Sequence, residues 1–129
     1  MSFSSYFDGW GPVRLFDATT MEELDTYAIP ESRDPAYADG FGDLSVHEVA
    51  TSGQDASLAY LSYYVGGLRV IDVSDEQITE VVAFIDEGGS NFWGVEVFER
   101  DGVEYVALSD RDKGLYILKY TPLIAGTHR

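Results

Sequence analysis

The stretch that decides the fold is Leu61-Ser62-Tyr63-Tyr64-Val65-Gly66-Gly67-Leu68-Arg69-Val70-Ile71. It returns 47 residues later, with Gly67 matched to Gly114, as Leu108-Ser109-Asp110-Arg111-Asp112-Lys113-Gly114-Leu115-Tyr116-Ile117-Leu118. A shorter copy, Gly11-Pro12-Val13-Arg14-Leu15-Phe16-Asp17, precedes both. β-Type segments that repeat at roughly 40–50 residues are typical of propeller blades, which are four-stranded sheets that cannot bury both faces alone. The sequence therefore predicts an all-β fold, a partial β-propeller of about two and a fraction blades of four-stranded antiparallel sheets.

Short apolar runs separated by turn residues divide the chain, read as one partial domain over residues 1–129, into three groups. Residues 11–29 are expected to supply the outer strands of an incomplete blade, residues 44–85 a complete blade, and residues 92–121 three strands of a last blade. The strands are expected at residues 13–16, 24–29, 44–49, 58–64, 68–73, 78–85, 92–98, 104–108 and 115–120. Prolines and glycines between the first two groups predict a loop without regular structure over residues 30–43.

The charge of the chain limits its partners. Eight Lys and Arg residues oppose 23 Asp and Glu residues, which gives a net charge of −15. A field of this sign repels phosphate backbones and anionic headgroups, so the sequence argues against nucleic-acid and membrane-surface binding and favours cationic, metallic or neutral partners. Because the acids are scattered, the acidity is typical of a halophilic protein, although a local cation site is the alternative.

Other classes of protein are excluded by composition. There is no cysteine, so disulfides and thiolate chemistry are absent. No apolar stretch reaches the length of a membrane span. The chain as written begins without a basic start or an apolar core, so no signal peptide is expected within it.

The segment Gly67-Leu68-Arg69-Val70-Ile71-Asp72-Val73-Ser74 resembles the LVIVD repeat of propeller-like bacterial and archaeal proteins, many of them at the cell surface. Residues 11–17 and 114–121 resemble degenerate copies, the latter with Lys119 in place of the motif's Asp. Residues 91–96 and 109–116 are similar to the carboxy-terminal end of secreted proteins with such repeats. The resemblance implies a fragment of a longer protein that is extracellular or at the cell surface. It implies no activity, because the family has none agreed.

Two features of the repeat have a structural interpretation. Asp17 and Asp72 each follow a predicted strand, where a carboxylate accepts backbone N–H groups two residues further on. Gly67 and Gly114 precede equivalent strands, where a positive φ or a close backbone approach would exclude a side chain.

The innermost strand of each blade supplies the main site candidates. Aligning Ser45-Val46-His47-Glu48-Val49 with Trp93-Gly94-Val95-Glu96-Val97 makes Glu48 and Glu96 equivalent, 48 residues apart. Two carboxylates from adjacent blades, with His47 nearby, could bind a divalent metal or share acid and base roles. However, His47 and Glu48 are adjacent on a strand and face opposite ways, and a repeated Glu can instead bond to the backbone of the next blade.

Asp110 and Asp112 form a second, weaker candidate for a metal site. Asp110-Arg111-Asp112-Lys113-Gly114 has the Asp-x-Asp-x-Gly pattern that begins a calcium loop. Further acidic ligands are lacking and Arg111 and Lys113 oppose the charge, so a solvated loop is the alternative interpretation. No resident cofactor is expected beyond Ca²⁺ or another divalent metal.

The aromatic residues suggest a third kind of site. They gather near two loops and could present flat faces to a carbohydrate or protein ligand, or instead fill the space between blades: Tyr60, Tyr63, Tyr64, Phe92 and Trp93.

Together these observations predict a non-catalytic binding or scaffold module of a surface or secreted LVIVD-repeat propeller protein. No catalytic residue is assigned, and His47, Glu48, Glu96 and Trp93 are the predicted binding residues. The alternative is a metal-dependent hydrolase or lactonase-like enzyme with a channel site at His47, Glu48 and Glu96. A structural remnant that pairs with the remaining blades of a parent, or with itself, is a third hypothesis, because two and a fraction blades leave sheet edges exposed.

Overall fold

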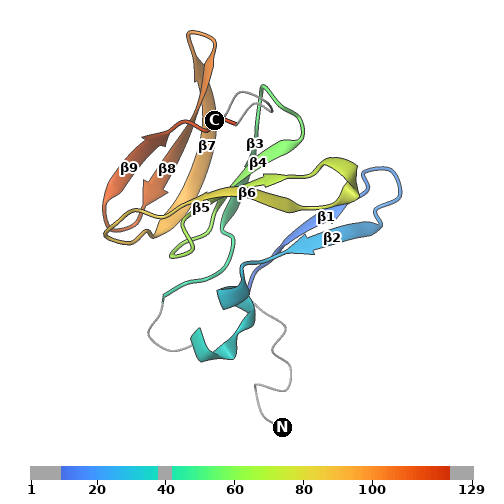
Figure 1. Ribbon diagram of the computed structural model, residues 1–129, viewed down its shortest axis with the longest axis horizontal. Helices are drawn as coiled ribbons and strands as arrows, with labels where there is room; N and C mark the ends of the chain where they lie inside the picture. The colour runs from blue at the N-terminus through green and yellow to red at the C-terminus, as the bar shows by residue number, and fades with distance from the viewer. Residues whose placement is uncertain (1–9, 38–41, 123–129) are drawn as a thin grey trace, which may run out of the picture.

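Nine strands in three antiparallel sheets make up the computed structural model, which describes residues 10–37 and 42–122 (Figure 1). Sheet A holds β1 (Val13–Phe16) and β2 (Glu23–Tyr27). Sheet B holds β3 (Glu48–Thr51), β4 (Leu58–Ser62), β5 (Leu68–Asp72) and β6 (Thr79–Phe84). Sheet C holds β7 (Phe92–Arg100), β8 (Val103–Asp110) and β9 (Gly114–Leu118). Within each sheet the strands follow one another in chain order.

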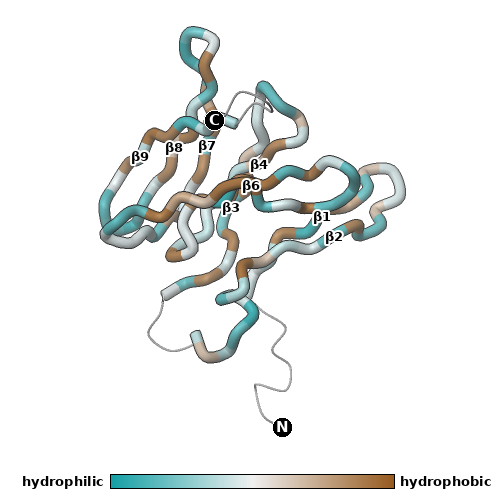
Figure 2. The backbone as a smooth tube through the Cα atoms, viewed as in Figure 1, coloured by the Kyte–Doolittle hydropathy of each residue, from teal (hydrophilic) through white to brown (hydrophobic). Residues whose placement is uncertain are grey.

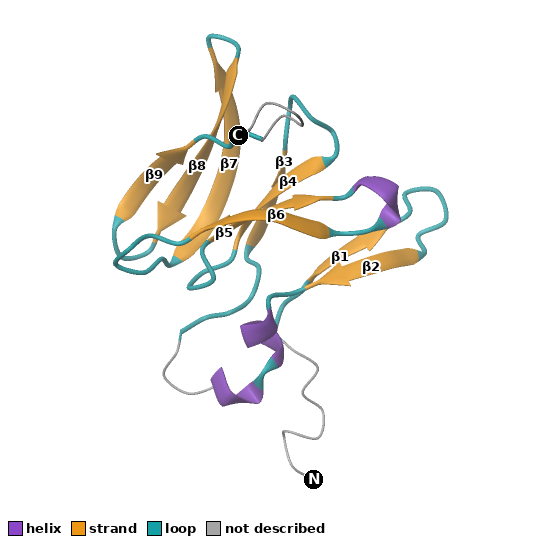
Figure 3. Cartoon of the chain, in the orientation of Figure 1, coloured by secondary structure: helices purple, strands orange, loops and turns teal. Residues whose placement is uncertain are grey.

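The all-β prediction and the division into sheets of two, four and three strands are confirmed (Figure 3). Most strand boundaries differ from the prediction by one or two residues, and the start of β3 differs by four. β3 begins at Glu48 rather than at residue 44, because Leu44 is buried in the core and the N–H of Val46 bonds to the carbonyl of Gly11, 3.0 Å away, outside the ladder. The expected irregular loop contains two short 3-10 helices, Pro30–Arg33 and Pro35–Tyr37. Each begins with a proline, whose fixed φ suits the first helical position. Part of that loop, residues 38–41, lies outside the described residues.

The strand register follows the sequence repeat. Ser62 pairs with Leu68 between β4 and β5, and Ser109 pairs with Leu115 between β8 and β9. Both pairs therefore keep the offset of the sequence repeat. Sheets B and C are two versions of one unit, and β5 corresponds to β9.

The predicted turns at the ends of these strands are also present. Oδ1 of Asp17 accepts the N–H groups of Thr19 at 2.8 Å and Thr20 at 2.9 Å. Oδ1 of Asp72 accepts the N–H of Ser74 at 2.8 Å. Backbone bonds from Thr20 and Thr19 hold the pKa of Asp17 below its usual value, because they favour the charged carboxylate.

The hydrophobic core lies between the sheets, in two layers. One layer, between sheets A and B, contains Ile29, Leu44, Ala59, Leu61, Tyr63 and Ile71. The other, between sheets B and C, contains Tyr60, Leu68, Val70, Phe92, Val95, Val106 and Leu108. Every residue of β4 is buried, because its alternate side chains enter opposite layers. The apolar segments accordingly run through the middle of the molecule (Figure 2). Each large side chain buried there contributes about 1.5–3 kcal/mol.

Candidate functional site

Carboxylates bind backbone N–H groups across the sheet boundaries. Asp25 of sheet A accepts the N–H of Ile78, 2.7 Å away, just before β6. Glu104 of sheet C accepts the N–H of Gly53, 2.7 Å away, just after β3. Some of the acidic residues thus join the sheets, and for these residues the acidity has a local structural role.

Glu48 makes the same kind of link from sheet B to sheet C. Its Oε2 accepts the N–H of Val95 at 2.8 Å. A Cβ at Gly94 would lie 3.4 Å from this Oε2 and 2.7 Å from Oγ of Ser109, so glycine leaves the space that the carboxylate crosses. Glu48 therefore makes the bond to the backbone of the next sheet that was the alternative to a metal-binding or acid–base role.

Glu96 is not equivalent to Glu48, and the alignment of 48 residues is wrong by two positions. Glu48 lies opposite Ser62 and donates its N–H to the Ser62 Oγ at 3.1 Å. In sheet C the residue opposite Ser109 that donates to the Ser109 Oγ is Gly94, at 2.9 Å. The alignment rested on a shared Glu-Val pair alone, and the register of β7 shifts between Phe92 and Gly94. The side chain of Glu96 is exposed, two positions further along the strand.

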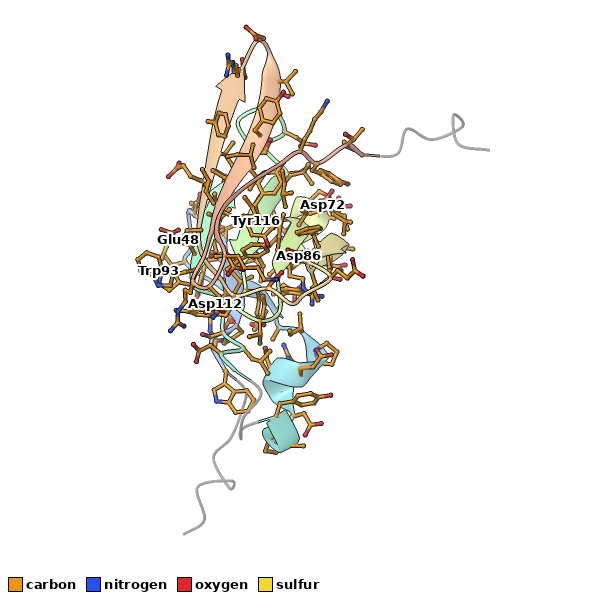
Figure 4. The ribbon with its side chains drawn as sticks, turned by 90° about the vertical axis from the view of Figure 1, so that its left-hand side faces the viewer. Glu48, Asp72, Asp86, Trp93, Asp112 and Tyr116 are labelled. Carbon is orange, nitrogen blue, oxygen red and sulfur yellow. The ribbon has the colours of Figure 1, made fainter. Side chains whose placement is uncertain are left out.

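That register shift also turns Trp93 outward. The ring of Trp93 is 51% exposed and lies against the ring of His47, with 4.8 Å between the centroids and 34° between the planes. Tyr64 meets the same histidine edge-on, at 5.5 Å. Three of the four predicted binding residues, His47, Glu48 and Trp93, therefore gather at one place, and Glu48 and Trp93 lie on the same side of the molecule (Figure 4).

Arg111 lies beside these aromatic rings, and it was not predicted from the sequence as a binding residue. Its guanidinium lies 5.5 Å from the centroid of the Tyr64 ring, a cation–π contact. Its Nη1 is 2.7 Å from Oδ2 of Asp43. Both side chains of that ion pair are about half exposed, so the pair contributes about 0–1 kcal/mol and leaves the guanidinium able to exchange partners. We call His47, Tyr64, Trp93 and Arg111 the aromatic cluster.

The backbone of Tyr64 supports a functional interpretation of the aromatic cluster. Its φ is +51°, in the left-handed region. For a bulky residue this conformation costs about 1–2 kcal/mol, and such strain gathers at functional sites. It is held here by two backbone bonds between Tyr64 and Phe92, at 2.8 and 3.1 Å.

The remaining aromatic candidates are core residues. Tyr60 is 3% exposed, and Tyr63 and Phe92 are fully buried. Of the five rings that could display flat faces, only Tyr64 and Trp93 reach solvent.

Asp110 and Asp112 accept hydrogen bonds from their own loop and from Asn91, which precedes β7. Asp110 is buried, and its carboxylate accepts the N–H groups of Asn91, Asp112 and Lys113 at 2.8, 2.8 and 3.0 Å. The Asp112 carboxylate accepts the side-chain amide of Asn91 at 3.0 Å. Within residues 10–37 and 42–122, no three or more His, Asp or Glu side chains form a group that could hold a metal ion. Calcium binding there stays a prediction.

A further acid lies at the boundary of sheets B and C. The Tyr116 hydroxyl donates to Oδ2 of Asp86, and the two residues are close together (Figure 4). This bond is the main cause that lowers the pKa of Asp86, and it raises the pKa of Tyr116 to about 12. Asp86 is therefore held charged as part of the packing.

No family model, curated protein or solved structure matches the chain. No helix among the described residues is long and apolar enough to cross a membrane.

Proposed function

We propose that this chain is part of a β-propeller and acts as a non-catalytic binding module, with the aromatic cluster as its recognition surface. The propeller arrangement is supported by sheets B and C, which repeat one register and pack face to face. Leu115 and Ile117 of β9, 72% and 48% exposed, occupy the positions that Leu68 and Val70 hold in sheet B. Sheet C buries Leu68 and Val70, so the outer face of sheet C suits a further sheet of the same kind.

The observation that carries the binding function is the half-exposed side chain of Trp93, which packs at a tilt against His47 next to the cation over Tyr64. Large aromatic rings are usually buried, so a supported and exposed ring is suited to a flat apolar ligand surface. Arg111 and His47 add hydrogen-bond donors at its rim. The net charge of −15 disfavours anionic ligands. A neutral carbohydrate combines a flat apolar face with hydroxyl groups and is the ligand class that we propose.

Fluorescence titration with neutral cello-, malto- and chito-oligosaccharides tests this function. A Trp10→Phe background leaves Trp93 as the reporter, because the chain has two tryptophans. We expect one oligosaccharide series to cause a saturable change in Trp93 emission. Because Trp93→Ala removes the reporter, its binding is measured by calorimetry, and we expect no binding. Phe98→Ala is the control, because Phe98 is 38% exposed on the same strand and stacks on Tyr105 instead. No binding to any series, or equal binding by Trp93→Ala, contradicts the proposal.

The alternative, a metal-dependent hydrolase at His47, Glu48 and Glu96, has less support. Glu48 is bonded to Val95, and Glu96 lies two positions from the equivalent place. Thermal shift with Ca²⁺, Mn²⁺ or Zn²⁺ tests the alternative, which predicts a metal-dependent rise in Tm that Glu96→Gln removes.

We also propose a surface or secreted parent protein with LVIVD repeats. The support is the sequence of residues 67–74. Further repeats and an export signal encoded in frame upstream of Met1 would be expected, and a stop codon directly upstream would contradict the proposal.

A further inference from the structure

Within residues 10–37 and 42–122, no strand of sheet C lies at the position that β6 occupies in sheet B. In sheet B, β6 pairs antiparallel with β5, through Leu68 with Phe84 and Val70 with Val82. β9 is the counterpart of β5, and no described residue pairs with its outer edge. With no described strand paired there, the backbone groups along that edge can bond another strand.

The sequence of β9 lacks the usual protection of an exposed edge. Sheet edges generally carry charged residues that prevent another chain from pairing. Each of the other edge strands among the described residues has at least one: β1, β2, β3, β6 and β7. β9 reads Gly-Leu-Tyr-Ile-Leu and has none, in a chain with 24% charged residues.

An apolar groove of about 310 Å³ lies between β6 and the end of β9. Val82 and Phe84 line one side, and Leu118 and Tyr120 line the other. Val82 is 41% exposed, whereas Val70, its partner in the ladder, is 1% exposed. Sheet C covers Val70, but the described part of the chain gives it no fourth strand to cover Val82.

Two equivalent glycines show the same open space. A Cβ at Gly67 would lie 2.3 Å from the carbonyl oxygen of Phe84 on β6. A Cβ at Gly114 would meet no atom within 4 Å. The space beside β9 is therefore open where its counterpart beside β5 is filled by a strand.

We propose that the outer edge of β9 binds one extended segment of another polypeptide, which adds antiparallel as the fourth strand of sheet C. Backbone bonds to β9 supply the pairing, and alternate apolar side chains of the segment enter the groove against Val82 and Phe84. This surface is separate from the aromatic cluster and does not depend on carbohydrate binding.

A single strand fits this place better than a second copy of the chain. Two copies that paired β9 with β9 would be related by a twofold axis perpendicular to the sheet, so both copies of sheet B would lie on the same face. The β6 strand of each copy would then need volume that sheet B of the other copy occupies. A segment without a second sheet behind it has no such conflict.

The charge of the chain limits the composition of the segment. With a net charge of −15, the protein favours a segment whose polar positions are neutral or basic. The model for its apolar pattern is β6 itself, Thr79–Phe84, which fills the same position in sheet B.

The test uses a fluorescein-labelled peptide with the sequence of residues 78–85, carrying Glu80→Lys to remove the like charge. Fluorescence anisotropy with the whole chain should show saturable binding. Amide hydrogen exchange should show new protection at residues 114–118. A peptide that also carries Val82→Pro should bind at least about tenfold more weakly, because proline removes a backbone donor and disfavours the strand.

Two protein variants locate the site. Val82→Asp places a charge in the groove and should weaken binding at least about tenfold. Val81→Asp is the matched control, because Val81 is also 41% exposed but does not line the groove, and its binding should change less than about twofold. Absence of binding, protection elsewhere than β9, or equal weakening by both variants overturns the proposal. A dimer in sedimentation whose β9 amides are already protected would overturn it as well.

Discussion

Glu104 is predicted to be a main polar link between sheets B and C. Its Oε2 accepts the hydroxyls of Ser52 and Tyr60 at 2.8 and 2.9 Å, and its Oε1 accepts the N–H of Gly53 at 2.7 Å. All three donors belong to sheet B or the turn after β3, whereas Glu104 is on β8. Glu104→Gln keeps the shape of the side chain but replaces an acceptor oxygen with a donor, so at least one sheet B donor loses its partner.

The expected cost follows from these bonds. A hydrogen bond to a charged group contributes about 1.5–3 kcal/mol, and water can replace part of this at a partly exposed side chain. We therefore expect Glu104→Gln to lower the free energy of unfolding by about 2 kcal/mol, which corresponds to a fall in Tm of about 6–10 °C for a chain of this size. Urea unfolding followed by circular dichroism measures the first quantity, and calorimetry the second.

The pH dependence identifies the carboxylate as the cause. Burial raises the pKa of Glu104, but the bonds from Ser52, Gly53 and Tyr60 outweigh burial and hold the pKa below its ordinary value of 4.5. A carboxylate with a lowered folded pKa stabilises the fold fully above its unfolded pKa, and this contribution is lost as the pH falls through the folded pKa. The stability difference between wild type and Glu104→Gln should thus be constant near about pH 7 and shrink below 4.5.

Glu96→Gln is the control for this prediction. Glu96 is exposed on the neighbouring strand β7, so its replacement should change stability by less than about 0.5 kcal/mol. An unchanged Tm in Glu104→Gln, or a difference that persists undiminished in strong acid, would refute the reasoning.

Two further substitutions test the repeat geometry. Gly67→Ala should destabilise the fold by about 3 kcal/mol or more, and Gly114→Ala by about 1 kcal/mol. Both residues have a positive φ, but only a Cβ at Gly67 would clash with Phe84. Equal losses of stability in urea titrations would contradict this geometry. Ser62→Ala should cost about 1–3 kcal/mol, because the buried hydroxyl donates to the carbonyl of Trp93 at 2.8 Å. A loss below about 0.5 kcal/mol would show that this bond does not hold the sheets together.

The candidate site was only partly predictable. His47, Glu48 and Trp93 were chosen as inner-strand residues, and the structure brings them together. Arg111 was missed because its contacts with Tyr64 and Asp43 join residues 47 and 68 positions apart in the sequence. The only signal in the sequence was its position in a loop of the repeat.

The sequence by itself determined the strands and their grouping. The repeat at Leu61–Ile71 and Leu108–Leu118 predicted equivalent strands, and the acids after strands predicted the turns at Asp17 and Asp72. These features are local, because alternating apolar residues, glycines and turn-forming acids act on their own neighbours.

Only the tertiary structure decided which side chains meet. A register shift in β7 placed Gly94, not Glu96, at the position equivalent to Glu48 and turned Trp93 to the surface. Where sheets B and C pack together, the Glu48 carboxylate accepts the backbone N–H of Val95. No fourth strand lies beside β9 among the described residues, and an apolar groove is therefore open there. Such outcomes depend on the register between strands and on the fit between sheet faces. A register shift of one residue moves every side chain of a strand to the other face, and no local sequence pattern specifies that register.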